Sequence, residues 1–374
     1  MSRKNKNEKP GEKIRKLTSG NEACGEGAIK AGCRFYAGYP ITPQNELTSY
    51  MSKRMEEEKG TFIQAESEIA AISMVHGASA AGARAMTSSS SPGISLKQEG
   101  ISYIAAMELP CVIVNVMRGG PGLGNIAPAQ GDYFQATKGG GHGDYKLIVL
   151  APASAQEMFD FTYRAFALAD KYNNPVMILA DGMLGQMMEP VEFDRSLAPP
   201  KEVKKPWALQ GAKGRPALSK KSLLLSAGVL EKHNLNLQKK YRKIEKEETF
   251  AEEYKAKDAE VIVCAYGSMA RIARSAVDAL REKGVKAGLI RPVTLWPFPE
   301  KIIGKHALRG AFFLVVEMSA GQMVEDVERA VENRKKVHFY GRMGGGIPEE
   351  KEIEKKIKSL LKKKKGKGDK KSER

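Results

Sequence analysis

Residues 111–124 read CVIVNVMRGGPGLG, an apolar and mostly β-branched run that ends in an arginine and a glycine-rich loop. Such a run is typical of a central strand in a parallel sheet, because that strand is buried on both of its faces. The arginine, Arg118, stands where the strand ends. Open α/β sheets bind their ligands at the carboxyl ends of their strands. The sequence therefore predicts an α/β fold with its functional residues at one edge of a parallel sheet.

Strand and helix patterns alternate on both sides of this run. Strands are expected at 34–38, 61–65, 83–88, 147–151 and 175–180, and helices at 21–31, 45–58, 67–80, 95–107 and 155–172. This alternation predicts a parallel sheet with helices on both faces. We therefore assign residues 18–200 to one α/β domain.

The remaining segments differ in composition. Residues 201–257 are first rich in Lys and Pro and then strongly charged, which predicts a connector with an exposed helix. Residues 258–350 return to alternating strand and helix patterns and predict a second α/β domain. Residues 1–17 are a basic N-terminal tail, and residues 351–374 are a Lys-rich tail that follows a short amphipathic helix.

The net charge of +17 is concentrated in the tails and the connector. Residues 1–17, 201–257 and 351–374 carry net charges of +5, +8 and +8, so the two predicted domains are close to neutral. A basic nucleic-acid-binding protein that uses residues 355–371 is the alternative from another functional class. It predicts DNA binding that weakens steeply with salt and is lost with the tail. The predicted domains carry no aromatic RNA-binding motif and no arginine-rich recognition helix.

Cysteine usage and hydropathy limit the class of protein further. The four cysteines are scattered without a Cys-x-x-Cys pair, which excludes a local zinc ribbon or ferredoxin-type cluster and is typical of a reducing cytoplasm. No run of 18 apolar residues occurs, and the charged N-terminal stretch has no apolar core of a secretory signal. We expect a cytoplasmic protein that does not enter a membrane.

Two further segments at strand ends are candidate site elements. Residues 39–43 read YPITP, where two prolines fix the backbone around the hydroxyl of Thr42. Residues 87–93 read TSSSSPG, a loop rich in hydroxyl and backbone N–H groups that could hold an anion or a polar ring. The first is equally compatible with a rigid turn in which Thr42 caps a helix, and the second with an ordinary helix start.

Two glutamates follow the strand at 61–65, in the string QAESEIAA. A glutamate in the first turn of such a small, nearly uncharged helix would be partly desolvated and suited to sharing a proton. The alternative is that Glu66, Glu68 or both only stabilise the helix dipole. Arg118 is placed to bind a carboxylate, or else pairs with a loop carbonyl or Asp132. The isolated His142 is more typical of a structural histidine.

Together these strings resemble the thiamine-binding pyrimidine domain of 2-oxoacid:ferredoxin oxidoreductases. The matching strings are AGYPITPQNEL (37–47), QAESEIAAISMVHGA (64–78), RAMTSSSSPGISLKQEG (84–100), RGGPGLG (118–124) and QGDYFQATKGGGHGD (130–144). VIVCAYGSMARIARSAV (261–277) and LIRPVTLWPFP (289–299) resemble the transketolase C-terminal-like domain of the same subunit. The resemblance covers most of residues 20–345 and is strongest to the branched-chain (3-methyl-2-oxobutanoate) type, with the 2-oxoglutarate type next.

The resemblance implies a role for each matching residue. Glu68 would be the catalytic glutamate that protonates the aminopyrimidine ring of thiamine diphosphate. Thr42 and Arg118 would bind the 2-oxoacid. The other implied cofactor contacts are Tyr39, Pro40, Ile41, Pro43 and Ser91. It gives no role to Glu66 or His142.

The resemblance also implies that this chain is one part of a heteromeric complex. The sequence has no Gly-Asp-Gly motif of the kind that holds Mg²⁺ and the diphosphate, and no cysteine cluster for electron transfer. A diphosphate-domain subunit would then supply the Mg²⁺ site, and gamma and ferredoxin-like subunits would complete the complex, with iron–sulfur clusters on a partner chain. No metal ligand is expected in this chain. The implied reaction is oxidative decarboxylation of a 2-oxoacid with coenzyme A, giving acyl-CoA, CO2 and reduced ferredoxin.

Overall fold

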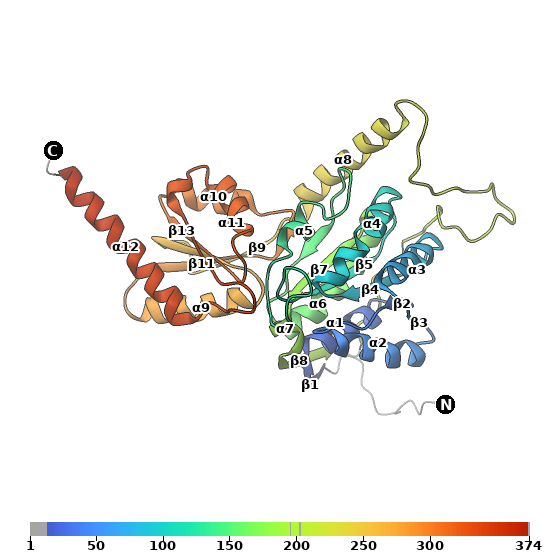
Figure 1. The fold of residues 1–374 in the computed structure, drawn as a ribbon, viewed down its shortest axis with the longest axis horizontal. Coiled ribbons are helices and arrows are strands. Elements are labelled where there is room, and N and C mark those ends of the chain that lie inside the picture. The colour runs from blue at the N-terminus through green and yellow to red at the C-terminus, as the bar shows by residue number, and fades with distance from the viewer. Residues whose placement is uncertain (1–12, 195, 202, 373–374) are drawn as a thin grey trace.

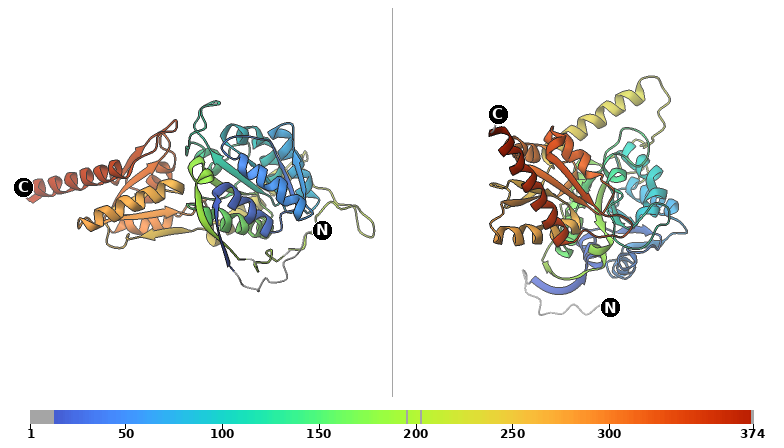
Figure 2. Two further views of the ribbon diagram at one scale, coloured as in Figure 1. Left: turned by 90° about the horizontal axis from the view of Figure 1, so that it is seen from below. Right: turned by 60° about the vertical axis from the view of Figure 1, so that its left-hand side comes forward.

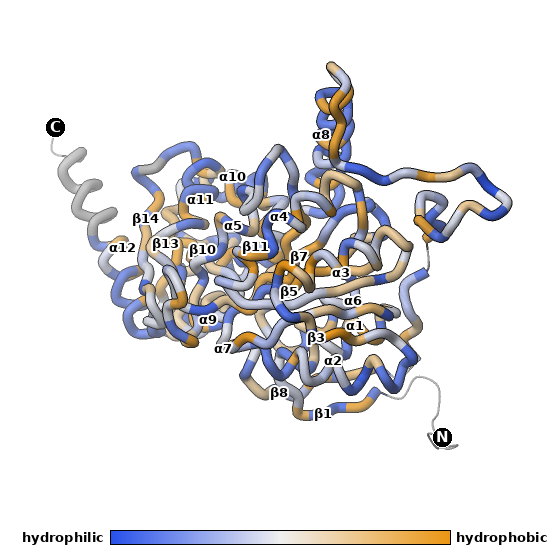
Figure 3. The backbone as a smooth tube through the Cα atoms, turned by 45° about the vertical axis from the view of Figure 1, so that its right-hand side comes forward, coloured by the Kyte–Doolittle hydropathy of each residue, from blue (hydrophilic) through white to orange (hydrophobic). Residues whose placement is uncertain are grey.

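A seven-stranded, mainly parallel sheet forms the centre of the N-terminal half of the computed structural model, which describes residues 13–194, 196–201 and 203–372 (Figure 1). The strands lie in the order β12-β6-β7-β5-β4-β2-β3, and only the β12–β6 pair is antiparallel. They are β2 (Phe35–Gly38), β3 (Thr61–Gln64), β4 (Ala85–Ser89), β5 (Val112–Met117), β6 (Ile148–Leu150), β7 (Val176–Asp181) and β12 (Thr294–Trp296). Figure 3 shows apolar residues along β5 and β7, and the residues of β5 are all buried, as predicted for a central strand.

Helices cover both faces of this sheet. They are α1 (Gly20–Lys30), α2 (Asn45–Glu57), α3 (Glu68–Ala80), α4 (Ser91–Ala106), α5 (Tyr133–Thr137), α6 (Ala155–Tyr172) and α7 (Gly182–Gln186). In Figure 1, α1, α2 and α6 lie below the sheet and α3 and α4 above it. The prediction that the fourth helix begins at residue 95 was wrong by one turn, because Pro92 occupies its first turn, where a proline is tolerated.

A second, five-stranded sheet forms the C-terminal half, in the order β14-β13-β10-β11-β9. Its strands are β9 (Ala251–Tyr254), β10 (Val261–Cys264), β11 (Ala287–Pro292), β13 (Phe312–Glu317) and β14 (Val337–Gly341), and its helices are α9 (Gly267–Glu282), α10 (Glu300–Leu308), α11 (Met323–Val331), η1 (Arg334–Lys336) and α12 (Glu350–Ser372). Ile353 and Ile357 are buried, so the first turns of α12 belong to this core. Figure 2 shows the rest of α12 extending away from the body.

The segments expected to be tails and connector are partly structured. Residues 13–17, assigned to the basic tail, belong to β1 (Lys13–Ser19), which pairs antiparallel with β8 (Met188–Asp194). Residues 1–12 of that tail lie outside the described residues. The connector contains α8 (Val229–Glu247). Most residues of this helix are exposed, but Leu237, Tyr241 and Ile244 are buried. The expected helix is thus present and mostly exposed, with one apolar face that packs on the body.

Buried polar contacts join the two halves of the molecule. The backbone and side chain of Gln130 bond to the backbone of Met318, and its amide nitrogen donates to the carbonyl of Tyr266 at 3.0 Å. The buried guanidinium of Arg291, on β11, donates twice to the carboxylate of Glu157, on α6, with both distances 2.8 Å. Because such groups would be costly to bury alone, these contacts fix the halves relative to each other.

Candidate active site

Four neighbouring strands end next to the predicted site residues. Parallel strands β5, β4, β2 and β3 lie side by side, so their carboxyl ends meet at one edge of the sheet. Arg118 follows β5, Ser91 follows β4, the 39–43 turn follows β2, and Glu68 begins the helix after β3. The sheet topology thus gathers residues that are up to 79 positions apart in the sequence.

Glu68 is buried, whereas Glu66 is exposed. Glu68 is the first residue of α3, and Ser67 caps that helix by accepting a hydrogen bond from the N–H of Ala70 at 3.2 Å. Within the described residues, the carboxylate of Glu68 has no hydrogen-bond or ion-pair partner. A buried carboxylate that has no partner and lies at a helix N-terminus is available to a ligand. This distinguishes Glu68 from the exposed Glu66.

Gly93, in the first turn of α4, gives the Glu68 carboxylate its space. A Cβ atom on Gly93 would lie 2.6 Å from Oε1 of Glu68 and 2.1 Å from the Oγ of Ser89. Both distances are far shorter than van der Waals contact, so only glycine fits at this position. The glycine in TSSSSPG therefore allows the end of β4, the start of α4 and the start of α3 to meet.

Arg118 and Thr42 are brought together by the fold. One Nη of Arg118 donates to the backbone carbonyl of Thr42 at 3.1 Å, and the other donates to the carbonyl of Leu123 at 3.0 Å. Its Nε is buried and, within the described residues, has no partner. The Thr42 hydroxyl is half-buried and accepts a hydrogen bond from Asn45 at 3.2 Å. Arg118 thus holds both loops by their carbonyls, as its structural alternative proposed, and its buried Nε–H is left without an acceptor in the described structure.

Ser91 connects this arginine to a buried carboxylate. Its hydroxyl lies 2.6 Å from Oδ2 of Asp132 and accepts the backbone N–H of Arg118 at 3.0 Å. Asn115, on β5, donates to the same Asp132 oxygen at 2.9 Å. Burial raises the pKa of Asp132, while these two hydrogen bonds oppose the rise. The alternative that pairs Arg118 with Asp132 is wrong in this structure, because Ser91 and Asn115 occupy that carboxylate.

The YPITP turn lies open on one side and buried on the other. Tyr39 and Pro40 are exposed, Ile41 is half-buried, and Pro43 is buried. Beneath the turn, a hydroxyl network joins Tyr36 to Ser88 at 2.6 Å and Ser88 to the amide oxygen of Gln44 at 2.5 Å.

Several buried polar atoms at this edge lack a partner in the described structure. They are the hydroxyls of Ser89 and Ser90, the Nε2 of Gln44 and the Oδ1 of Asn115. Buried polar atoms are nearly always hydrogen-bonded, so a group of unpartnered ones indicates a polar ligand. Together with the free Glu68 carboxylate, these atoms match the donors and acceptors of an aminopyrimidine ring. No group of three or more His, Cys, Asp or Glu residues suited to a metal ion occurs in the described part of the chain.

Lys97 is a buried lysine beside the candidate site that was not predicted from the sequence. It lies on α4, is fully buried, and donates from Nζ to the Thr87 hydroxyl at 2.7 Å. Burial lowers the pKa of Lys97 to about 7, against the opposing charge of Glu68. The available signal was its spacing of four residues from Gly93, which puts both on one face of α4.

His142 is exposed and contacts Tyr103 edge-on, with ring centroids 6.1 Å apart.

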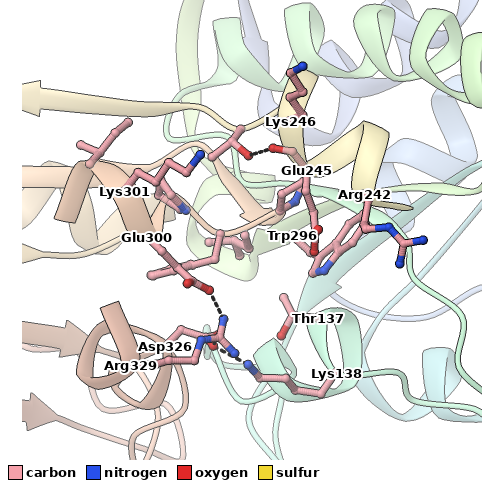
Figure 4. A pocket seen from close by; sticks show the side chains of 16 residues that line it. Thr137, Lys138, Arg242, Glu245, Lys246, Trp296, Glu300, Lys301, Asp326 and Arg329 are labelled. Carbon is pink, nitrogen blue, oxygen red and sulfur yellow. Dashed lines mark hydrogen bonds and ion pairs between the residues drawn. The ribbon is translucent and has the colours of Figure 1, made fainter. Parts of the chain in front are cut away.

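A cavity of about 660 Å³ lies elsewhere, at the junction of the two halves (Figure 4). Its walls come from α5, α8, α10, α11 and the segment around β12. Trp296, Pro297 and Phe298 form an apolar side, and the ion pairs Glu300–Arg329 and Lys138–Asp326 lie on another. None of Thr42, Glu68, Ser91 and Arg118 lines it, so this cavity is separate from the candidate active site.

Comparison with known families identifies the class of protein. A family model described as "Pyruvate flavodoxin/ferredoxin oxidoreductase, thiamine diP-bdg" matches residues 26–256, and one described as "Pyruvate:ferredoxin oxidoreductase core domain II" matches residues 259–353. The chain therefore belongs to the thiamine-binding pyruvate flavodoxin/ferredoxin oxidoreductases. This confirms the family, the fold class and the enzyme class predicted from the sequence.

Individual relatives place the chain among separate subunits of this family. It is 51% identical to "Ketoisovalerate oxidoreductase subunit VorB" of Methanothermobacter marburgensis, over 92% of this chain and 97% of that one. It is 39% identical to "2-oxoglutarate synthase subunit KorA" of Methanocaldococcus jannaschii, over 90% of this chain and 98% of that one. The chain is thus a 2-oxoacid:ferredoxin oxidoreductase subunit, with VorB-type relatives ranking above KorA-type relatives as predicted.

Two solved structures resemble the fold. "2-oxoglutarate:ferredoxin oxidoreductase from Magnetococcus marinus with 2-oxoglutarate, coenzyme A and succinyl-CoA bound" matches with a TM-score of 0.82 and 28% identity, over 92% of this chain and 65% of that one. This chain therefore spans about two thirds of that longer protein. "Split gene transketolase, inactive beta4 tetramer" matches with a TM-score of 0.56 at 14% identity, which supports the transketolase-like fold alone. No helix among the described residues is long and apolar enough to cross a membrane.

Proposed function

We propose that this chain is the alpha-type subunit of a heteromeric, thiamine-diphosphate-dependent oxidoreductase that oxidises a branched-chain 2-oxoacid, 3-methyl-2-oxobutanoate. The products would be an acyl-CoA, CO2 and reduced ferredoxin. The name of the 51% identical relative, a ketoisovalerate oxidoreductase subunit, supports this substrate. The 39% identical KorA relative and the 2-oxoglutarate-bound neighbour support 2-oxoglutarate as the second candidate.

The observation that carries the proposal is the free, buried carboxylate of Glu68 at the carboxyl edge of the sheet. When bound, thiamine diphosphate supplies a carbon nucleophile and an electron sink for decarboxylation. Glu68 would exchange a proton with the aminopyrimidine ring nitrogen, and the unpartnered hydroxyls of Ser89 and Ser90 would bond to that ring. The remaining contacts to the cofactor would come from Ser91 and from residues 39–43 (Tyr39, Pro40, Ile41, Thr42, Pro43).

Arg118 and Thr42 would bind the 2-oxoacid. The Arg118 guanidinium lies beside the Thr42 turn, and its buried Nε–H is free to donate. A guanidinium in such a place binds a carboxylate strongly, because its hydrogen bonds are charge-assisted. The Thr42 hydroxyl would add a neutral hydrogen bond to the 2-oxo group or the carboxylate.

Partner subunits would complete the active site. The 374 residues contain no Gly-Asp-Gly motif and no clustered cysteines, so we assign the Mg²⁺–diphosphate site to a diphosphate-domain subunit. Iron–sulfur clusters would lie on a ferredoxin-like partner, and a gamma subunit would complete the assembly. The four cysteines of this chain are free and buried, in keeping with a cytoplasmic location.

The decisive experiment compares Glu68→Gln with Glu66→Gln in the complex purified from its native host. The amide introduced by Glu68→Gln keeps the shape of the side chain but cannot share a proton, so turnover should fall by roughly 10²–10⁴-fold. Glu66→Gln, which changes an exposed side chain in the same string, is the matched control and should leave turnover within about twofold. Size-exclusion chromatography checks assembly. Equal activity of Glu68→Gln and wild type would remove Glu68 from the mechanism.

The reaction class has its own test. The purified complex should be brown and should reduce ferredoxin or a viologen dye in the presence of coenzyme A, with 3-methyl-2-oxobutanoate, 2-oxoglutarate and pyruvate assayed side by side. Reduction of NAD without a ferredoxin-type acceptor would instead identify a dehydrogenase-type complex. The isolated chain should neither decarboxylate a 2-oxoacid nor bind thiamine diphosphate tightly in the presence of Mg²⁺.

A further inference from the structure

The fully buried Lys97 has an arrangement that a purely structural lysine does not need. Lysine is among the residues least often buried, because desolvation of an ammonium group is costly. In the described structure the Nζ of Lys97 makes one hydrogen bond, to the Oγ1 of Thr87 at 2.7 Å, and no ion pair. An ammonium has three donors, so this group lies in the core with most of its hydrogen-bonding capacity unused.

The backbone geometry places Lys97 one helical turn beyond the point where the Glu68 carboxylate meets α4. Gly93 and Lys97 are one helical turn apart on the same face of α4. Opposite them on β4, Ser89 and Thr87 are two residues apart and therefore point to the same face of the sheet. Ser89 and the Glu68 carboxylate meet at Gly93, while Thr87 meets Lys97. Lys97 thus lies between α4 and β4, one helical turn from the position where Glu68 meets α4.

Glu68 is the charged group that acts on Lys97. Among the described residues, the elements around α4 contribute the neutral Thr87 from β4 and the carboxylate of Glu68 from α3. Burial lowers the pKa of Lys97 to about 7, and the charge of Glu68 opposes that fall. Interaction between two titrating groups is reciprocal, so the protonation of Lys97 must also act on Glu68.

We propose that Lys97 is a positioning residue that acts through Glu68 and sets whether this carboxylate can hold a proton for the bound cofactor. This inference rests on the proposed function for its catalytic consequence. As an ammonium, Lys97 opposes a further positive charge on a ring bound next to Glu68. As a neutral amine, Lys97 removes that opposition, which favours proton exchange between Glu68 and the ring. The active form of the site therefore carries an uncharged Lys97.

The first test measures coupling between the two residues in the full chain, without cofactor. A lysine with a depressed pKa in the fold binds fewer protons than in the unfolded chain. Stability must therefore rise with pH, starting at the folded pKa and ending near the unfolded one. The urea midpoint of the wild type should rise relative to that of Lys97→Met from about pH 7 to about pH 10. In Glu68→Gln, the start of this rise should move to lower pH, by about half a unit or more. Lys53→Met, at an exposed lysine, should show no such change.

The second test measures turnover against pH in the assembled complex. In Lys97→Met the acid limb of the kcat profile should move to lower pH by about half a unit or more, and Lys97→Gln gives the same comparison if the methionine variant folds poorly. An acid limb that stays in place overturns the proposal, whether or not stability changes, because Lys97 would then be purely structural. An unmoved stability onset in Glu68→Gln overturns it as well. Failure of the proposed function is separate: the wild-type complex would then lack thiamine-dependent oxidation of any 2-oxoacid.

Discussion

The contact between Gly93 and Glu68 allows the candidate site to be disturbed without removing any of its chemical groups. In Gly93→Ala, the added Cβ would lie 2.6 Å from Oε1 of Glu68 and 2.1 Å from Oγ of Ser89. Carbon and oxygen atoms at van der Waals contact are about 3.4 Å apart, so the carboxylate must retreat by roughly 0.8 Å. The serine hydroxyl must retreat by more, or rotate away.

This displacement sets the expected magnitude. A misplacement of about 1 Å in a catalytic group can lower the rate by about 10²-fold, so we expect kcat to fall by roughly 30- to 100-fold. Overpacking should also destabilise the chain by about 1–3 kcal/mol. Shifting the carboxylate should change turnover far more than complex assembly.

Gly77→Ala is the matched control. Gly77 lies in α3, the same helix that Glu68 begins. A Cβ atom on Gly77 would meet no atom within 4 Å. Replacement of a helical glycine by alanine should stabilise the chain by about 0.5–1 kcal/mol and leave kcat unchanged. The assay is steady-state turnover in the assembled complex, with urea unfolding of each full chain. Equal kcat in Gly93→Ala and Gly77→Ala would refute the placement of Glu68 at the reacting centre.

Three further predictions concern the substrate loops and the junction. Arg118→Ala should raise the KM for the 2-oxoacid about ten- to a hundredfold, since a charge-assisted contact is worth roughly 1.5–3 kcal/mol. If the KM were unchanged and complex assembly were lost, Arg118 would only hold the loops together. Thr42→Val should lower reaction with the 2-oxoacid more than thiamine diphosphate affinity, and Thr42→Ser should be milder; the measurement is kinetics with separate cofactor titration. Arg291→Met should lower the free energy of unfolding by about 3 kcal/mol, near the low end for a buried pair, because Glu157 keeps 26% of its side-chain surface in water. A loss under about 1 kcal/mol in urea unfolding would contradict the role of Arg291 in joining the halves.

Local patterns were sufficient for most of the fold, but not for strands formed by distant pairing. The apolar run at 111–116 and the small-residue helix after 61–65 carry their own periodicity, so β5 and α3 were predicted. β1 reads as a charged tail, because its side chains are mostly exposed and its stability comes from pairing with β8, some 170 residues away. β12 is three residues long and pairs with β6, about 145 residues earlier in the chain. Such pairing leaves no periodic signal in the sequence.

The candidate site also combines residues that sequence patterns could place with residues that they could not. Sequence could place Glu68, Ser91, Thr42 and Arg118 at strand ends, because parallel strands align their carboxyl ends. It could not choose between Glu66 and Glu68 by pattern alone, since burial depends on how α3 rests against α4. Lys97 was missed for a related reason: a lysine in a helix is expected to face solvent, and its spacing of four residues from Gly93 indicates burial only once Gly93 is known to face the sheet.

The position of β12 bears on how this protein can be divided. β12 comes from the C-terminal half, yet it completes the N-terminal sheet by pairing with β6, where Thr294 faces Leu150 and Trp296 faces Val149. A fragment that stops at residue 257 would keep all the candidate catalytic side chains but leave the β6 edge open. Uncovered sheet edges invite pairing between molecules, so such a fragment should aggregate. The two modules recognised as separate families are therefore interdependent in folding, and exchanging one of them between homologues requires carrying the β12 strand with the N-terminal module.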